Sequence, residues 1–97
     1  THAMQFVVEC QDKPGQLQLR LSTRPPHLAY LQSHSASILL AGPLLDDAGQ
    51  PNGSLLVFDV ANRAALDAII NNDPYALAGL FATVRVSPFR KTLPATP

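Results

Sequence analysis

The order of the predicted elements, β, α, β, β, α, β, indicates an α+β fold of the split βαβ or ferredoxin-like arrangement, with an antiparallel sheet and helices on one face. Three observations support this prediction: strand-like alternation near both ends of the chain, two helical stretches, and a breaker-rich loop near the middle. A chain of 97 residues has room for one small domain, which we expect to span residues 4–91.

The first strand and the first helical region occupy the opening third of the chain. Residues 4–11 place Met4 and alternate apolar residues up to Cys10 on one side, which predicts a strand. A helical region then begins near Pro14 and continues to about His34. We expect Met4 to be the natural start and residues 1–3 to be a remnant without a functional role.

Two adjacent prolines interrupt the helical pattern. Pro25 and Pro26 have no backbone N–H and clash with a preceding helical turn. We therefore expect a break or kink near Arg24, and a second helical segment capped by Ser22 or Thr23.

A strand, a polar loop and a longer strand follow. Residues 38–41 predict a short buried strand that ends at Gly42 and Pro43. Residues 44–53 are rich in Asp, Gly, Pro and Asn, which is typical of a loop joining two strands. Residues 54–60 are apolar on both sides of a strand pattern, which indicates that both faces of the sheet are covered.

The last third of the chain predicts two helices and a final strand. Asn62 is a good N-cap for a helix with apolar residues at helical spacing. Asp73 before a proline predicts a second cap, which opens a short helix over residues 75–80. Residues 81–87 alternate as a strand, and residues 92–97 are expected to form a loose tail.

The composition excludes several classes of function. Seven basic and seven acidic residues give zero formal charge, which disfavours nucleic acid and anionic membranes as partners. No apolar run approaches a membrane span, and a single cysteine, Cys10, excludes an intramolecular disulfide and fits a cytoplasmic location. No metal-ligand spacing and no dinucleotide or phosphate-loop motif is present, so we expect no metal and no cofactor.

A hydrophobic fraction of 46% is high for a lone small domain. One face of the predicted sheet is left without helices, yet the strands carry apolar residues on both sides. We therefore expect a homodimer that packs sheet against sheet by two-fold symmetry, in a barrel-like form.

Cations and a histidine gather in the first helical region. At helical spacing Arg20, Arg24 and His27 fall at i, i+4 and i+7 and share a face, beside an apolar stripe of leucines. A helix N-terminus and two arginines would favour the neutral imidazole, which is the form a general base needs. The alternative is a kinked core helix with solvated arginines and a surface histidine.

Three further residues are candidates for the same site. Asp73 could hold the histidine with its second oxygen, or it could be a helix cap alone. Ser54 could donate to a substrate, or it could be an ordinary turn residue. Tyr75 could hydrogen-bond a ligand, or it could only pack against its neighbours.

Short motifs along residues 4–91 form a recognisable set: Arg20-Leu21, Arg24-Pro25, His27-Leu28, Ala41-Gly42-Pro43, Gly53-Ser54, Asn72-Asp73-Pro74-Tyr75, Ala78-Gly79 and Pro88-Phe89. Together they resemble the YciI-like (YCII-related) proteins. The resemblance implies a ferredoxin-like dimeric α+β barrel, and a pocket centred on His27 and Asp73 with Ser54 as a further lining residue. Most members have no known activity, and a relative in chloroaromatic breakdown is a dehydrochlorinase.

Three functions remain open from the sequence. The first is a cofactor-independent enzyme in which His27, oriented by Asp73, moves a proton in an elimination, isomerisation or hydrolysis, with Arg20 or Arg24 attracting a negative substrate. The second is a non-catalytic module that binds a small molecule. The third is a structural dimerisation module, which a separation above about 4 Å between the histidine and the aspartate would favour.

Overall fold

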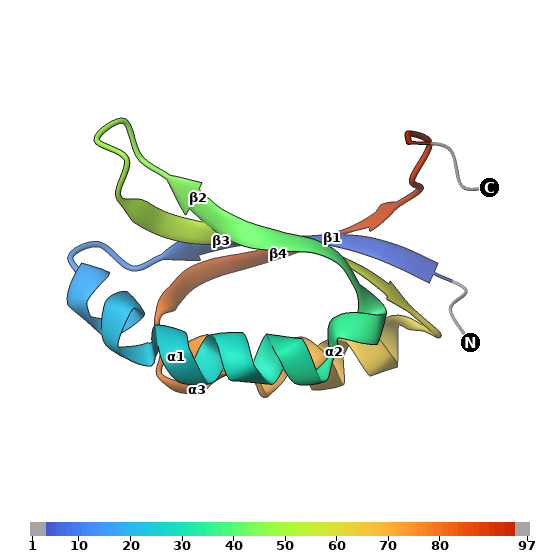
Figure 1. Cartoon of the computed structure of the whole chain (residues 1–97), viewed down its shortest axis with the longest axis horizontal. Helices are drawn as coiled ribbons and strands as arrows, with labels where there is room; N and C mark the ends of the chain where they lie inside the picture. The colour runs from blue at the N-terminus through green and yellow to red at the C-terminus, as the bar shows by residue number, and fades with distance from the viewer. Residues whose placement is uncertain (1–3, 95–97) are drawn as a thin grey trace.

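The computed structural model describes residues 4–94 and shows a four-stranded antiparallel sheet with its helices on one face (Figure 1). In chain order the elements are β1 (Met4–Asp12), α1 (Leu17–Ser33), the 3-10 helix η1 (Ser35–Ser37), β2 (Ile38–Leu45), β3 (Pro51–Val60), α2 (Arg63–Asn71), α3 (Pro74–Leu77) and β4 (Phe81–Phe89). The strands lie in the order β2-β3-β1-β4, so the predicted ferredoxin-like fold is confirmed. The expected remnant, residues 1–3, and the end of the expected tail, residues 95–97, lie outside the described residues.

The hydrophobic core lies between the two central strands and the helices. Its fully buried members alternate along β1 and β3 and include one residue of α2: Phe6, Val8, Cys10, Leu56, Phe58, Val60 and Leu66. Val8 lies directly opposite Leu56 in the antiparallel register. Burying a large apolar side chain contributes about 1.5–3 kcal/mol, so these residues fix the helices against one face of the sheet.

A single helix runs through both prolines, so of the predicted break or kink the break is wrong. α1 is continuous from Leu17 to Ser33, and Ser22 donates to the carbonyl of Leu19 instead of capping a second segment. Pro25 and Pro26 are exposed, so the carbonyl groups that lose their helical partners lie on a side that water reaches. Figure 1 shows the first turns at an angle to the rest of the helix, which is the bend that proline produces.

The second strand is longer than the sequence predicts. β2 continues through Gly42 and Pro43 to Leu45, and β3 begins at Pro51. Pro43 is tolerated because β2 is an edge strand of the sheet, where a missing N–H leaves no ladder bond broken inside the sheet. The loop is therefore short, and Asp46 closes it by accepting the backbone N–H groups of residues 48 and 50.

The two predicted caps in the last third are confirmed. Asn62 accepts the backbone N–H of Ala65 at the start of α2, and Asp73 accepts that of Tyr75 at the start of α3. α3 ends at Leu77, earlier than expected, and Gly79 then turns the chain with a φ of 75°. Among residues 4–94, no helix is both long enough and apolar enough to span a membrane.

Candidate active site

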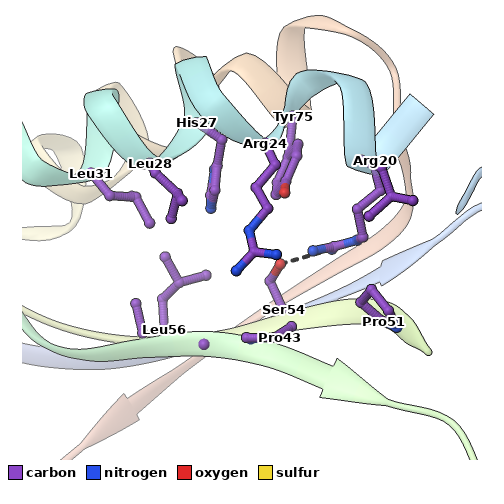
Figure 2. Close-up of a pocket in the computed structure, with 13 residues that line it drawn as sticks. Arg20, Arg24, His27, Leu28, Leu31, Pro43, Pro51, Ser54, Leu56 and Tyr75 are labelled. Carbon is purple, nitrogen blue, oxygen red and sulfur yellow. Dashed lines mark hydrogen bonds between the residues drawn. The ribbon is translucent and has the colours of Figure 1, made fainter. Parts of the chain in front are cut away.

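A pocket of about 250 Å³ lies between α1 and the facing strands β2 and β3 (Figure 2). Thirteen residues line it: Arg20, Leu21, Arg24, His27, Leu28, Leu31, Ala41, Gly42, Pro43, Pro51, Ser54, Leu56 and Tyr75. Arg20, Arg24 and His27 all reach this space from α1, which confirms their predicted common face. The pocket thus brings together every predicted site residue except Asp73, which lies behind its lining.

His27 and Asp73 meet although they are 46 positions apart in the chain. Nδ1 of His27 lies 2.8 Å from Oδ1 of Asp73, and both side chains are buried. The same oxygen accepts the backbone N–H of Tyr75 at 2.9 Å. The expectation that the second carboxylate oxygen would hold the histidine is therefore wrong, because one oxygen both caps α3 and contacts the imidazole.

His27 lies in the middle of α1, whereas the expected second segment would have placed it in or just after a first helical turn. The expected effect of a helix N-terminus on its charge therefore does not apply. Its orientation comes from Asp73, and since a carboxylate only accepts hydrogen bonds, we assign the ring hydrogen to Nδ1. Nε2 has no hydrogen-bond partner among residues 4–94. Every buried side-chain nitrogen in this range has a partner, so Nε2 cannot be buried. It is therefore open to the pocket that His27 lines.

Tyr75 joins the two polar groups of the site. Its ring stacks on the imidazole of His27 with centroids 3.8 Å apart, and the guanidinium carbon of Arg20 lies 4.6 Å from the ring centroid. Figure 2 shows the phenol oxygen turned toward the pocket. Burial raises the pKa of Tyr75, and nearby carboxylates add to this while the two arginines oppose it. The hydroxyl group therefore keeps its proton at neutral pH and can donate to a ligand.

Arg20 is held in a buried network. Its Nε donates to Oδ2 of Asp12 at 2.5 Å, and its Nη2 donates to Oδ1 of Asp12 at 2.9 Å and to Oγ of Ser54 at 2.8 Å. Burial lowers the pKa of Arg20, but the hydrogen bond and the charge of Asp12 outweigh burial and raise it overall. Arg20 is therefore a fixed cation whose charge Asp12 already balances.

Arg24 differs from Arg20 in its exposure and in its contacts. It is exposed, and the ion pairs among residues 4–94 involve Arg20, His27 and Arg63 instead. Figure 2 shows its side chain extending from α1 across the pocket toward Ser54 and the sheet. Its guanidinium group is thus available to a ligand.

The sequence analysis missed Asp12 and left Ser54 open between a substrate donor and a turn residue. Asp12 is the last residue of β1, and two-residue alternation from Cys10 places it on the face toward the helices, a signal that its loop-like context concealed. Ser54 lies within β3, opposite Cys10 and Pro43, so its interpretation as a turn residue is wrong. Within the described part of the chain, no group of three or more His, Cys, Asp or Glu side chains is arranged to hold a metal ion.

Comparison with known proteins gives matches over nearly the whole chain. Protein YciI of Escherichia coli is 38% identical over 96 residues, covering 91% of this chain and 98% of that protein. Among solved structures, the 5-chloro-2-hydroxyhydroquinone dehydrochlorinase of Burkholderia phenoliruptrix, in complex with 2,5-dihydroxybenzoquinone, is 32% identical with a TM-score of 0.86, covering 96% of this chain and 100% of that chain. Protein Atu4242 of Agrobacterium tumefaciens, at 15% identity and a TM-score of 0.60 over 97% of this chain and all of that one, is similar in fold alone.

The family comparison agrees with these relatives. The YCII-related domain matches residues 4–90, which include all the side chains that line the pocket. With a match of this length and a relative at 38% identity, the chain belongs to the YCII-related domain family.

Proposed function

We propose that this protein is a small-molecule enzyme in which His27 acts as general base and acid, and Asp73 holds the imidazole in place. The observation that supports this most directly is the 2.8 Å contact between the two side chains, with the other ring nitrogen open to a pocket. The purely structural reading, which a separation above about 4 Å would have favoured, gains no support from this contact. The proposed chemistry is a proton transfer that uses no cofactor.

Elimination is the reaction that we favour over isomerisation and hydrolysis. A structural relative at 32% identity is named a dehydrochlorinase, and loss of HCl is an elimination. In such a step Nε2 of His27 takes a proton from the substrate, and the electron pair of the broken bond forms a new double bond. The leaving group departs with its own bonding pair, and Asp73 stabilises the imidazolium that forms. The proton later leaves to solvent or product.

The remaining site residues divide into two roles in this proposal. Arg24, Tyr75 and Ser54 bind the substrate, because each has a donor group that faces the pocket. Arg20, which the sequence analysis also assigned to the substrate, acts as a positioning residue that holds Ser54 and packs on the ring of Tyr75.

A homodimer is the proposed assembly. On the sheet face away from the helices, Leu40, Val57 and Val7 lie in one row across β2, β3 and β1. Leu40 is 53% exposed whereas Val57 is only 6% exposed, so the apolar surface that a two-fold copy can cover lies mainly at Leu40. Light scattering should give about twice the chain mass of 10.4 kDa, and a monomer mass at micromolar concentration would refute the dimer. A cytoplasmic location likewise remains a prediction.

Turnover in a screen of small halogenated and hydroxylated aromatic compounds tests the enzyme proposal. We expect His27→Ala to lower turnover by about 10²–10⁴-fold, the usual contribution of general acid–base catalysis. His34→Ala is the matched control, because His34 follows the last turn of α1, packs against Tyr30 and does not line the pocket.

The alternative is a non-catalytic module that binds a small molecule in the same pocket. Asp73→Asn distinguishes the two, because asparagine keeps an oxygen for the cap of α3 and loses only the charge beside His27. An enzyme should lose turnover in this variant while ligand binding persists. Compounds that bind the wild type without being converted, with no dependence of any reaction on His27, would favour the binding module.

A further inference from the structure

The charges that line the pocket are unbalanced. The lining includes two arginines and a histidine, but no aspartate or glutamate. The two carboxylates that lie behind this lining are already engaged, Asp12 by Arg20 and Asp73 by His27. Arg24 itself forms no ion pair among the described residues.

We infer that the pocket takes a small organic anion with an apolar body, a carboxylate or a phenolate, whose negative group lies against Arg24. The inference rests on the proposed function only in taking this pocket as the ligand site. A guanidinium group offers a planar fork of N–H donors that matches two anionic oxygens, and the exposure of Arg24 lets a ligand from solution reach it.

Two hydroxyl groups add to the anion-binding side of the pocket. Oγ of Ser54 accepts a hydrogen bond from Arg20, so its own hydrogen is left for a ligand. The hydroxyl of Tyr75 also faces the pocket, on the same side as the guanidinium of Arg24 (Figure 2). The side chains of Arg24, Ser54 and Tyr75 thus offer hydrogen-bond donors to the pocket, and Nε2 of His27 offers it an acceptor. A ligand cation would meet repulsion and few acceptors there.

The rest of the lining sets the size and the polarity of the ligand body. It is apolar on both walls, from Leu21, Leu28 and Leu31 on α1 to Ala41, Pro43, Pro51 and Leu56 on the sheet. The volume of about 250 Å³ falls below the range of about 300–1,000 Å³ that drug-sized ligands fill. The body that fits is therefore about one ring in size.

Benzoate and benzamide test this inference, because they share one ring and nearly one shape while only benzoate is charged. Titration of the full chain, followed by NMR, should give at least about tenfold tighter binding of benzoate, and this preference should shrink as salt is added. Arg24→Gln should weaken benzoate about tenfold and change benzamide by less than about twofold. Arg90→Gln, at an exposed arginine away from the pocket, should change neither.

Equal binding of the two probes by the wild type would overturn the inference, as would unchanged benzoate binding in Arg24→Gln or an equal loss in Arg90→Gln. These outcomes are separate from the test of catalysis. His27→Ala should keep the preference for benzoate, because the recognition of charge is assigned to Arg24. If the preference is absent while turnover depends on His27, this inference fails alone. If the preference is present and no turnover depends on His27, the proposed enzyme fails alone.

Discussion

The ion pair between Arg20 and Asp12 predicts a large loss of stability in the variant Asp12→Asn, which keeps the shape of the side chain and removes its charge. The two side chains are only 4% and 6% exposed. Removing one partner of a buried pair costs about 3–5 kcal/mol, because the remaining charge stays where water cannot solvate it. Small domains have a free energy of unfolding of about 5–15 kcal/mol, so this variant should lose about a fifth of it or more.

An exposed ion pair in the same chain provides the matched control. Arg63 and Asp67 pair on α2 with Nε and Oδ1 2.8 Å apart, and their side chains are 55% and 44% exposed. The chemistry and the distance resemble those of the buried pair, whereas the burial differs. An exposed i,i+4 pair contributes about 0.3–0.5 kcal/mol, so Asp67→Asn should change stability little. The difference between the two variants therefore reports the effect of burial together with that of the second hydrogen bond from Arg20 to Asp12.

Urea and thermal unfolding, followed by circular dichroism, measure both variants. For a domain of this size, each kcal/mol shifts Tm by about 4–8 °C, so Asp12→Asn should lower Tm by at least about 12 °C. Asp67→Asn should stay within about 4 °C of the wild type. Similar free energies of unfolding for the two variants would refute the reasoning that burial makes the Arg20 pair important.

Two further predictions concern residues next to the site. Burial, with a smaller contribution from the charge of Asp73, raises the pKa of Cys10 from 9.0 to about 12, so the folded protein should resist alkylation at pH 8. Since the thiol of the unfolded chain loses its proton at a lower pH, the free energy of unfolding should fall as pH rises above about 9. Rapid alkylation of the folded chain at pH 8 would contradict the raised pKa of Cys10. Gly53→Ala should destabilise by about 1–3 kcal/mol in urea unfolding, because an added Cβ would lie 2.5 Å from the carbonyl oxygen of Cys10. Gly42→Ala, whose added Cβ meets nothing within 4 Å, is the control, and an equal loss in both would contradict the steric argument.

Local patterns predicted the elements well, because their causes are local. Helical spacing alone placed Arg20, Arg24 and His27 on one face, and this face lines the pocket. The caps at Asn62 and Asp73 followed from side-chain chemistry at helix starts. The failures came where tertiary structure overrides local preference: the packed α1 continues through two prolines, and the edge strand β2 accepts another.

The polar contacts of the site were harder to predict from spacing. Nothing local to Arg20 selects Asp12 over Asp73 as its partner, because the choice depends on how α1 lies across the sheet. Residue chemistry likewise left Asp73 open between a partner of His27 and a simple cap, and the family resemblance favoured the pairing. The structure shows that the apolar stripe beside these residues is partly exposed, with Leu21 and Leu28 lining the pocket instead of the core.

The start of α3 makes the fold and the site depend on each other. A helix of four residues has little stability of its own, so contacts outside it must hold it in place. Oδ1 of Asp73 holds both the backbone N–H of Tyr75 and the imidazole of His27, while the ring of Tyr75 packs against that imidazole and against Arg20. A shift of α3 would therefore disturb the proposed base, His27, and the hydroxyl group of Tyr75 together. Conversely, a ligand that holds His27 and Tyr75 in place also stabilises the start of α3, because these are the same contacts.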